Sequence, residues 1–525
     1  MISFFRALFS DRYLFWLGFT AGVLSLWILS RLRNYLPAIT KLITRTFRSI
    51  HEHLTTGIEQ RYRQDIIRFS QRQHLASTMF SLDEIIIEPY LMVQPKFVSN
   101  NNQTLPIDTV NLTIPYIPDW PELAATYQTP KLSIFESLQK QANIALAGNP
   151  GSGKTVALAH LACQIARKSS ETGNLAHFIP LYIHAVDIDY PFVESSNSTT
   201  SMETGDSPAS ETNNQLMKSL LRVIVEALTP HLSTIILPRL PRFIQSALET
   251  NRAILLLDGL DELSPDRIKP VKSFLKDLVT RFPNFQIVCT VSFENMADLP
   301  SMGFHVMALT VWGDSEKSTF VQQWRLAWHK LPPSDKQDRD EWAIQQYLSA
   351  WLTVPNLPCS PLEYTLKVWS AYAGDLMGAD FPSAIEAYIR RLTVTHSKSR
   401  EMLERLALHM ALSMNPAIQP RMSDTIPTRH DGDPIQGGDH QQSGESLPEP
   451  QKVKLSQLPT ELVNAGMLQV HSGSRFRFAN PVITGYLAAK ALVTYSGLSR
   501  ILEQPAWSCK STSLFFLSHF GEASS

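Results

Sequence analysis

The part of this sequence best suited to chemistry is a glycine-rich run that follows a short apolar segment. The run and the residue after it read Gly148-Asn149-Pro150-Gly151-Ser152-Gly153-Lys154-Thr155-Val156. Glycines let the backbone fold closely around phosphate groups, so that consecutive amides and the start of the next helix face the negative charge. In the pattern Gly-x-x-x-x-Gly-Lys-Thr the lysine reaches the β- and γ-phosphates, and the threonine hydroxyl commonly ligates Mg²⁺. Residues 148–156 are therefore predicted to bind a nucleotide.

An acidic segment further along the chain supplies the other groups that such a site needs. It reads Leu255-Leu-Leu-Asp258-Gly-Leu-Asp261-Glu262. We expect a buried strand ending at Asp258, whose carboxylate would hold Mg²⁺ together with Thr155. Asp261 and Glu262 are candidates to orient or deprotonate the attacking water, and with Lys154 they form the predicted catalytic set. The alternative is a structural strand followed by a helix start, where capping alone favours acidic residues.

Apolar runs alternate with helical patterns around these two segments. The runs are Ile144–Ala147, Phe178–Ile183, Ala253–Leu257 and Phe285–Thr290, and the helical stretches are Val156–Arg167, Gln215–Leu228 and Leu240–Leu248. Short strands separated by helices are typical of an α/β fold with a parallel sheet. The glycine-rich run lies between a predicted strand and a predicted helix, which is the context that the motif requires.

Composition narrows the class of protein. A chain of 525 residues is long enough for about two to four domains. Lys and Arg total 47 against 48 for Asp and Glu, so overall charge gives no direct indication of nucleic-acid binding. The four cysteines, at positions 163, 289, 359 and 509, are far apart, which argues against a disulfide framework and favours a reducing compartment.

An uncharged segment near the N-terminus predicts a membrane anchor. Residues 13–30 carry no charge and are rich in Leu, Trp and Phe, and at ~1.5 Å per residue they just span a bilayer core. A signal peptide and a buried core helix are the alternatives. Basic residues are sparse before this segment and frequent after it, from Arg31 to Arg72. The positive-inside rule then predicts a single-pass membrane protein whose C-terminal nucleotide-binding portion lies in the cytoplasm.

The chain resembles the NACHT-type P-loop NTPases of the signal-transducing STAND group. The acidic segment Leu255–Leu263 carries most of this resemblance, because its Asp-Gly-x-Asp-Glu form is typical of that family. Weaker matches are Phe178–Ile183, Pro361–Leu366 and Phe478–Ala489. They resemble the strand after the loop helix, the Asn-Pro-Leu segment of the family, and the end of its winged-helix region.

The resemblance implies a module of three parts that close over a nucleotide. A helical domain and a winged-helix domain would follow the α/β domain, and Pro361 would pack against the nucleotide. The family usually acts as a switch whose ADP state is closed, while ATP permits self-association into a homo-oligomer. A ligand that favours one of two conformations shifts their populations in this way. ATP and ADP with Mg²⁺ are the implied ligands, and GTP is not excluded.

The expected organisation follows from the pattern and the resemblance together. It comprises an anchor at 1–31, a basic amphipathic juxtamembrane stalk at 32–76, a linker at 77–130 with a strand at Glu84–Leu91, the nucleotide-binding domain at 131–300, a helical domain at 301–395, a winged-helix-like domain at 396–495, and the start of a C-terminal helical unit at 496–525 whose continuation is absent or cut off. Disordered insertions are predicted at 194–214 and 423–450, where Ser, Thr, Gly, Gln and acidic residues dominate.

Two positions depart from the family pattern. Family members commonly carry an Arg that senses the γ-phosphate after the strand that ends here at Thr290, but residues 290–293 read Thr-Val-Ser-Phe. Hydrolysis is therefore expected to be slow or absent. Asn480 stands where the family often has a His that reaches the β-phosphate. Asn480 followed by Pro481 is also an ordinary helix start, with Asn as N-cap, and we favour that interpretation.

The sequence leaves three functions open. The leading hypothesis is a membrane-anchored nucleotide switch that self-associates in its ATP state and answers to an unknown protein or ligand signal. The second is a P-loop ATPase that turns over continuously. The third is a membrane scaffold that holds nucleotide for stability, since a bound ligand stabilises a fold without catalysis.

Overall fold

The structure, a computed structural model, describes most of the chain in separate stretches. The described residues are 16, 19–24, 57–93, 131–139, 142–191, 209–293, 296, 298–332, 341–352, 359–393, 397–419, 462–495 and 497–520. They divide into two units, residues 1–61 and residues 62–525. The predicted insertion at 423–450 lies outside the described residues.

The first unit contains the predicted anchor. Residues 16 and 19–24 are helical, and the hydroxyl of Thr20 donates to the carbonyl oxygen of Trp16 at 2.8 Å. The rest of the predicted span at 13–30 lies outside the described residues. Within the residues that the structure describes, no helix is long and apolar enough to cross a membrane. The anchor and the orientation of the chain stay predictions.

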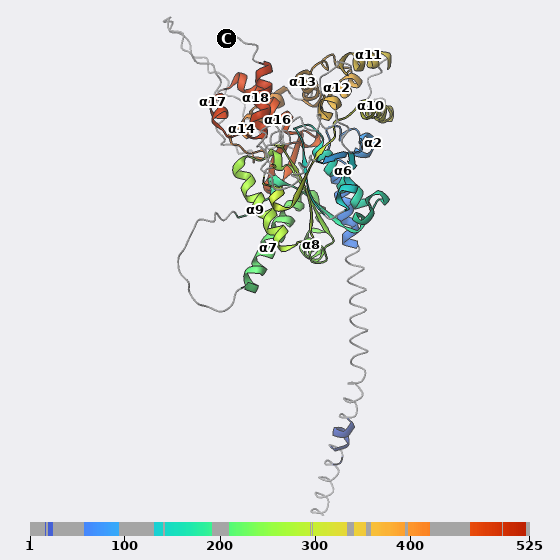
Figure 1. Ribbon diagram of the computed structural model, residues 1–525, viewed down its shortest axis with the longest axis vertical. Coiled ribbons are helices and arrows are strands. Elements are labelled where there is room, and N and C mark those ends of the chain that lie inside the picture. The colour runs from blue at the N-terminus through green and yellow to red at the C-terminus, as the bar shows by residue number, and fades with distance from the viewer. Residues whose placement is uncertain are drawn as a thin grey trace, which may run out of the picture. The chain divides into compact units, whose positions relative to one another are not determined.

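The second unit is built around a seven-stranded sheet (Figure 1). Its strands are β1 (Tyr90–Val93), β2 (Lys131–Ser133), β3 (Asn143–Ala147), β4 (Ile179–His184), β5 (Ala253–Asp258), β6 (Gln286–Val291) and β7 (Phe304–Leu309). They are ordered β2-β1-β7-β3-β6-β5-β4, and the five from β3 to β7 are mutually parallel. The predicted α/β fold with a parallel sheet is confirmed.

Helices follow the sequence pattern and cover both faces of the sheet. They are α6 (Lys154–Arg167), α7 (Ala209–Leu228), α8 (Leu240–Glu249) and α9 (Pro265–Arg281). Helix α6 lies on one face, and α7, α8 and α9 lie on the other (Figure 1). Because both faces are covered, β4, β5 and β6 are buried along their whole length and read as apolar runs. Residues 209–214, expected within a disordered insertion, form the first turns of α7.

The sheet extends beyond the predicted boundaries of the nucleotide-binding domain. Residues 84–91 do not form the expected strand, because α2 occupies Leu82–Ile85 and β1 begins at Tyr90. Ser81 and Glu84 form a capping box, which favours a helix start there. Strand β1 pairs antiparallel with both β2 and β7, and α5 (Ile134–Leu138) follows β2. Strand β7, beyond the expected boundary at residue 300, pairs with β3.

Residues 62–70 are helical and belong to the second unit, although the sequence assigned them to a stalk. Tyr62 and Ile66 are fully buried. The guanidinium of Arg63 donates to the carbonyl oxygens of Ile165 and Phe178 at 2.8 and 2.7 Å. The stalk prediction is therefore wrong from residue 62 onward, because the basic side chain that suggested a lipid surface instead satisfies buried carbonyl groups.

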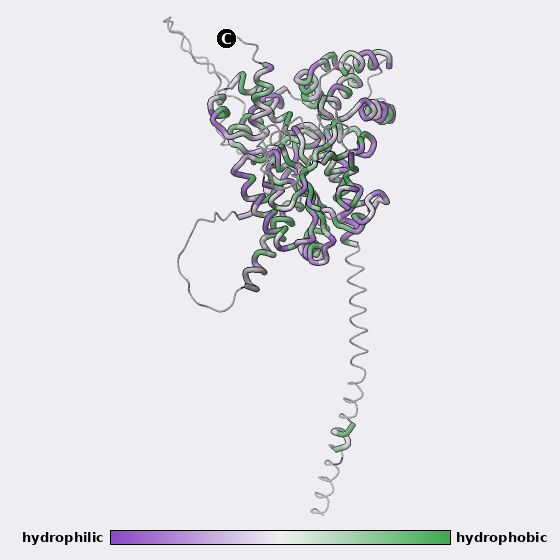
Figure 2. The backbone as a smooth tube through the Cα atoms, in the orientation of Figure 1, coloured by the Kyte–Doolittle hydropathy of each residue, from purple (hydrophilic) through white to green (hydrophobic). Residues whose placement is uncertain are grey.

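The remaining helices share a second hydrophobic core. They are α10 (Asp314–His329), α11 (Glu341–Leu352), α12 (Pro361–Ala373), α13 (Phe381–Thr393), α14 (Ser397–Leu412), α16 (Pro481–Thr494), α17 (Leu498–Glu503) and α18 (Ser508–Phe520). Figure 2 shows hydrophilic and hydrophobic residues alternating along helices of this part, as expected for helices that bury one face. Between α14 and α16, strands β8 (Leu468–His471) and β9 (Arg475–Phe478) form an antiparallel hairpin. Ile418 pairs with Phe476 beside it.

Candidate functional site

The glycine-rich run forms a tight turn between β3 and α6. The amide of Gly148 donates to the carbonyl oxygen of Val291 on β6 at 3.2 Å, which fixes the start of the turn. Gly153 precedes the first residue of α6 with φ of 95°, a left-handed conformation that favours glycine. The N-terminus of α6 therefore opens on the loop, where unpaired backbone amides and the helix dipole favour an anion.

The Lys154 side chain is held inside the loop. It is only 6 % exposed, and its ammonium group donates to the carbonyl oxygens of Gly148 and Asn149 at 2.7 and 3.0 Å. The same nitrogen lies 3.1 Å from a carboxylate oxygen of Asp261. These contacts hold one buried positive charge beside the loop.

The predicted Mg²⁺ ligands lie side by side. The hydroxyl of Thr155 donates to Asp258 at 3.2 Å, although the two residues are 103 positions apart in sequence. A hydroxyl and a carboxylate are the hard oxygen donors that Mg²⁺ prefers, and nucleotide phosphates and water usually complete its shell. These residues therefore fit a nucleotide-bound Mg²⁺ ion.

Asp258 is enclosed by polar partners. The Thr290 hydroxyl donates to Asp258 at 3.0 Å and accepts from the amide of Gly259 at 2.8 Å. The Tyr182 hydroxyl lies 3.4 Å from its other carboxylate oxygen. Burial raises the pKa of Asp258 above its usual value. A divalent cation bound beside this carboxylate would act in the opposite direction and favour its ionised form.

The two acids after Asp258 have different partners. Asp261 pairs with Lys154, and Glu262 accepts two hydrogen bonds from the Arg477 guanidinium, each at 2.8 Å. Burial alone would raise the pKa of Glu262, but the charges of Arg477 and His184 lower it to about 2. Glu262 is thus an ionised carboxylate already bound by a residue of the hairpin, which sequence pattern did not indicate.

Gly259 allows this arrangement of acids. Its φ is 75°, and a Cβ atom added there would lie 2.1 Å from the Nε2 atom of His184. A side chain at this position would meet both backbone strain and the buried imidazole ring. The structure of this chain therefore requires glycine at the second position of the Asp-Gly-x-Asp-Glu pattern.

These groups line a cavity of about 850 Å³, a size typical of small-molecule sites. Its walls come from the sheet domain, from residues 65–90 before it, from the starts of α10 and α12, and from residues 463–481. Of the predicted binding residues, Pro150 to Val156 and Pro361 line the cavity, whereas Gly148 and Asn149 lie behind it and hold Lys154. The buried hydroxyl of Ser152 has no hydrogen-bond partner among the described residues.

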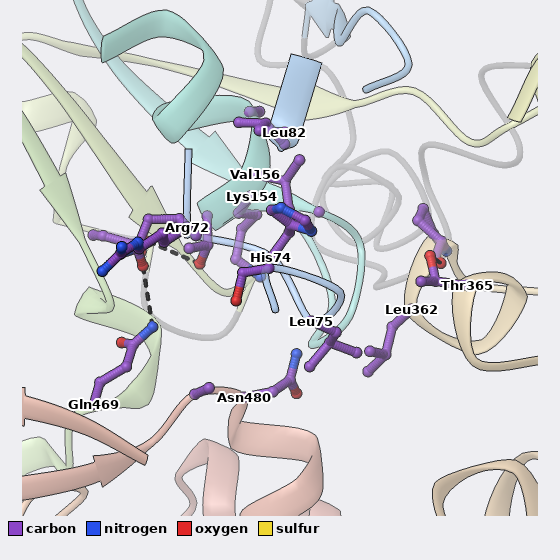
Figure 3. Close-up of a pocket in the computed structure, with 18 of the residues that line it drawn as sticks. Arg72, His74, Leu75, Leu82, Lys154, Val156, Leu362, Thr365, Gln469 and Asn480 are labelled. Atoms are coloured by element: carbon purple, nitrogen blue, oxygen red, sulfur yellow. Dashed lines mark hydrogen bonds between the residues drawn. The ribbon is translucent and has the colours of Figure 1, made fainter. Parts of the chain in front are cut away.

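Helix α12 contacts the loop directly. Pro361 occupies its first turn, the Ser360 side chain accepts from the amide of Glu363, and the amide of Leu362 donates to the carbonyl oxygen of Gly151 at 3.1 Å. Figure 3 shows the Leu362 and Thr365 side chains on this wall, with Leu75 facing Leu362. The structure thus places Pro361 in the wall of the cavity, beside the phosphate-binding loop.

Asn480 serves as a helix cap and also borders the cavity. Its side-chain oxygen accepts from the amide of Val482 at 2.9 Å, with Pro481 in the first turn of α16. This confirms the favoured interpretation of Asn480 as an N-cap. Figure 3 shows its side chain directed toward Leu75 and Leu362.

Several cavity residues were missed because they belong to the segment taken for a stalk. Arg72, His74 and Leu75 line the cavity and are drawn in Figure 3. Burial lowers the pKa of His74 to about 4, so its imidazole is neutral near pH 7. Figure 3 also shows the hydrogen bond from Gln469 to Gln73, 3.2 Å long, which joins this segment to the hairpin. Only the spacing of its apolar residues, which predicts a helix with one buried face, could have indicated that it packs on the domain.

The strand, the glycine-rich loop, the helix that follows it and the acid at the end of β5 define a P-loop nucleotide-binding domain. Residues 142–327 match the family model of the NACHT domain. This part of the chain is therefore a NACHT domain, as the acidic segment predicted, which is consistent with a NACHT-type NTPase of the STAND group. No curated protein matches the chain.

Proposed function

We propose that this protein is a signalling switch operated by ATP and ADP. The observation that carries the proposal is the cavity, since its walls come from the P-loop domain, α12 and the region from the hairpin to α16. A ligand held between parts of a chain stabilises whichever arrangement it fits better. Exchange of one nucleotide for the other would then change how these parts are arranged.

The proposed roles follow from the contacts described. The amides of residues 151–155 and the ammonium of Lys154 bind the phosphates, and Thr155 with Asp258 holds Mg²⁺. The metal, when bound, neutralises charge on the phosphates. Apolar side chains beside the loop, among them Leu75, Leu82 and Leu362, suit a base. The site itself gives no clear preference for adenine over guanine.

Hydrolysis is proposed to be slow. No Arg follows Thr290 to stabilise charge on the γ-phosphate, and the Glu262 carboxylate is occupied by Arg477. A general base must be within hydrogen-bond reach of the water that it activates. These features favour a switch over a continuously cycling ATPase.

We further propose that residues 13–30 anchor the protein in a membrane, with the NTPase portion in the cytoplasm, and that the ATP state self-associates through copies of this chain. The uncharged span and the basic residues after it support the anchor. Deleting residues 1–32 should move the protein from the membrane fraction to the soluble fraction. Retention on membranes after this deletion would contradict the anchor.

The decisive experiment identifies the nucleotide that copurifies with the detergent-solubilised protein and measures particle mass before and after exchange to a non-hydrolysable ATP analogue. Retained ADP with a rise in mass supports the switch. Steady turnover at constant mass would instead indicate a cycling ATPase. Bound nucleotide with neither turnover nor a change in mass would indicate a scaffold.

A further inference from the structure

The β8–β9 hairpin is attached to the sheet domain by a buried polar cluster. Asp187 lies in the short 3-10 helix η3 (Ala185–Asp187) that follows β4. Its carboxylate lies 2.7 Å from the Nδ1 atom of His471, and it accepts from the amide and the hydroxyl of Ser472 at 2.9 and 2.7 Å. Arg475 adds a further hydrogen bond at 3.2 Å. One carboxylate of the sheet domain thus binds three consecutive or nearby positions of the hairpin.

A second attachment joins the same hairpin to the acid of the nucleotide site. Glu262 belongs to η6 (Leu260–Glu262), which follows β5, the neighbour of β4 in the sheet. Its partner Arg477 lies on β9, and the two side chains are 7 % and 5 % exposed. Arg477 also donates to Gln469 at 2.6 Å and to the Nε2 atom of His471 at 3.3 Å. The two attachments therefore share His471 and form one connected network.

A buried network of this kind favours two conformations, with all its contacts formed or all of them broken, over intermediate ones. Removing a single partner from a buried ion pair leaves an uncompensated charge, which is strongly unfavourable. If the hairpin leaves as a body, all its partners are exposed to water together and each charge is solvated. The hairpin is therefore expected to be either fully seated or fully released, which is the property a switch element requires.

We infer that Arg477 is a positioning residue that withholds Glu262 from catalysis while the hairpin is seated, so that hydrolysis requires release of the hairpin. The inference rests on the proposed function, because it assumes that nucleotide bound beside Lys154 meets Glu262 as the acid that activates water. Seated, the bidentate contact occupies both oxygens of the Glu262 carboxylate. Released, the same carboxylate faces the cavity that it already lines.

The test weakens the hairpin attachment without touching the nucleotide site. Asp187→Asn removes the charge that binds His471, Ser472 and Arg475, and Asp187 does not line the cavity. Hydrogen exchange of residues 468–478 measures release of the hairpin, and ATP hydrolysis measures kcat and KM separately. Asp277→Asn is the matched control, because that carboxylate lies on α9 of the sheet domain and accepts a hydrogen bond from Tyr190 at 2.7 Å instead of from the hairpin.

We expect Asp187→Asn to raise both exchange in the hairpin and kcat severalfold, with KM little changed, while Asp277→Asn leaves both at the wild-type level. Adding Glu262→Gln to Asp187→Asn should abolish the gain in kcat and keep the faster exchange. Arg477→Lys should show a smaller gain than Arg477→Met, because a single guanidinium nitrogen contacts both oxygens of Glu262 and a lysine ammonium can keep a charge beside the same carboxylate. A merely structural role for the cluster would change stability in all these variants and leave kcat unchanged.

Two results would overturn the inference. One is faster exchange of the hairpin with unchanged kcat, and the other is a gain in kcat that survives Glu262→Gln. If Asp187→Asn does not fold, Arg475→Gln weakens the same carboxylate contact at its most exposed member and takes its place. Failure of the proposed function is distinguished by the mass measurement on the wild-type protein, because a cycling ATPase or a scaffold would show no change in particle mass on exchange of the nucleotide.

Discussion

The phosphate loop and the hairpin attachment are both polar, yet they are built in opposite ways. The loop takes its groups from consecutive residues, 148–155, and its lysine charge contacts two backbone carbonyls of the loop and the Asp261 carboxylate. The hairpin attachment joins side chains that are 215 to 288 positions apart, such as Glu262 with Arg477 and Asp187 with Arg475. A site made from local backbone geometry is complete as soon as the loop itself is folded. The hairpin attachment, in contrast, forms only in one arrangement of the domains.

This difference suggests a division of work. The loop is expected to keep its shape when the nucleotide changes, because β3 and α6 fix both of its ends. The hairpin attachment is expected to respond to a change in the arrangement of the domains, since its ion pairs are made or lost together. The predictions below separate the two regions.

The largest expected effect is on the loop. Lys154→Ala should lower nucleotide affinity by about a hundredfold or more, since a charge-assisted hydrogen bond contributes about 1.5–3 kcal/mol and several phosphate contacts are lost. Titration with a fluorescent ADP analogue measures this. Lys276→Ala, at an exposed position of α9, is the control. Unchanged affinity in Lys154→Ala would contradict the phosphate-loop assignment. Altered hydrogen exchange of the hairpin in this variant, measured without nucleotide, would show that the two regions are not independent.

An intermediate effect is expected from pH, through the hairpin. Burial lowers the pKa of His471 to about 4, against which the Asp187 carboxylate raises it and His184 and Arg477 lower it further. A histidine with a lowered folded-state pKa contributes stability that is present above about 6.5 and is lost as pH falls toward 4, because the unfolded chain then binds more protons. The free energy of unfolding should fall across this window by up to about 1.4 kcal/mol per pH unit for this histidine.

Urea unfolding at several pH values measures this dependence. His471→Gln should remove part of the slope and leave the remainder, since burial also lowers the pKa of His74 and His231 to about 4. A slope that is the same in the variant and the wild type would contradict the assignment to the hairpin.

The smallest effect is expected at Asn480, which follows the hairpin as the N-cap of α16 and lines the cavity beside the loop. Asn480→Ala should lower the free energy of unfolding by about 1 kcal/mol through loss of the cap, whereas Asn480→Ser keeps a capping oxygen and should change it little. Thermal unfolding and ADP titration of both variants measure the two roles. Loss of ADP affinity in Asn480→Ser would show that the amide, and not only the cap, acts on the nucleotide.

The parts of the structure that sequence predicted are those set by local pattern. The strands that became β3, β4, β5 and β6 were found because burial on both faces of a parallel sheet requires apolar runs. Thr155 and Asp258 were paired correctly because the carboxyl ends of parallel strands meet at one edge. Residues 62–76 were misassigned because Arg63 and Arg72 look like a membrane-facing stalk, and their partners, such as the carbonyls of Ile165 and Phe178, carry no signal in sequence.

The bond between Glu262 and Arg477 escaped prediction for the same reason. An acid after a buried strand is part of a recognisable family motif, whereas an Arg in a short strand is not. Neither segment therefore contains a sequence pattern that identifies the other as its partner. Similarly, α2 displaced an expected strand because a capping box at Ser81 and Glu84 outweighed the apolar run that follows it.

The helix at residues 62–70 has a further consequence for how the protein avoids unwanted association. Strand β4 ends the order of the sheet, and an unprotected edge strand is a template for pairing with another chain. Here the Tyr62 hydroxyl caps the carbonyl oxygen of Pro180 at 2.8 Å, and the Phe69 ring lies 5.3 Å from that of Tyr182. One hydrogen-bonding group of β4 is therefore already bound within the chain, which leaves less of this edge free to pair with a strand of another copy.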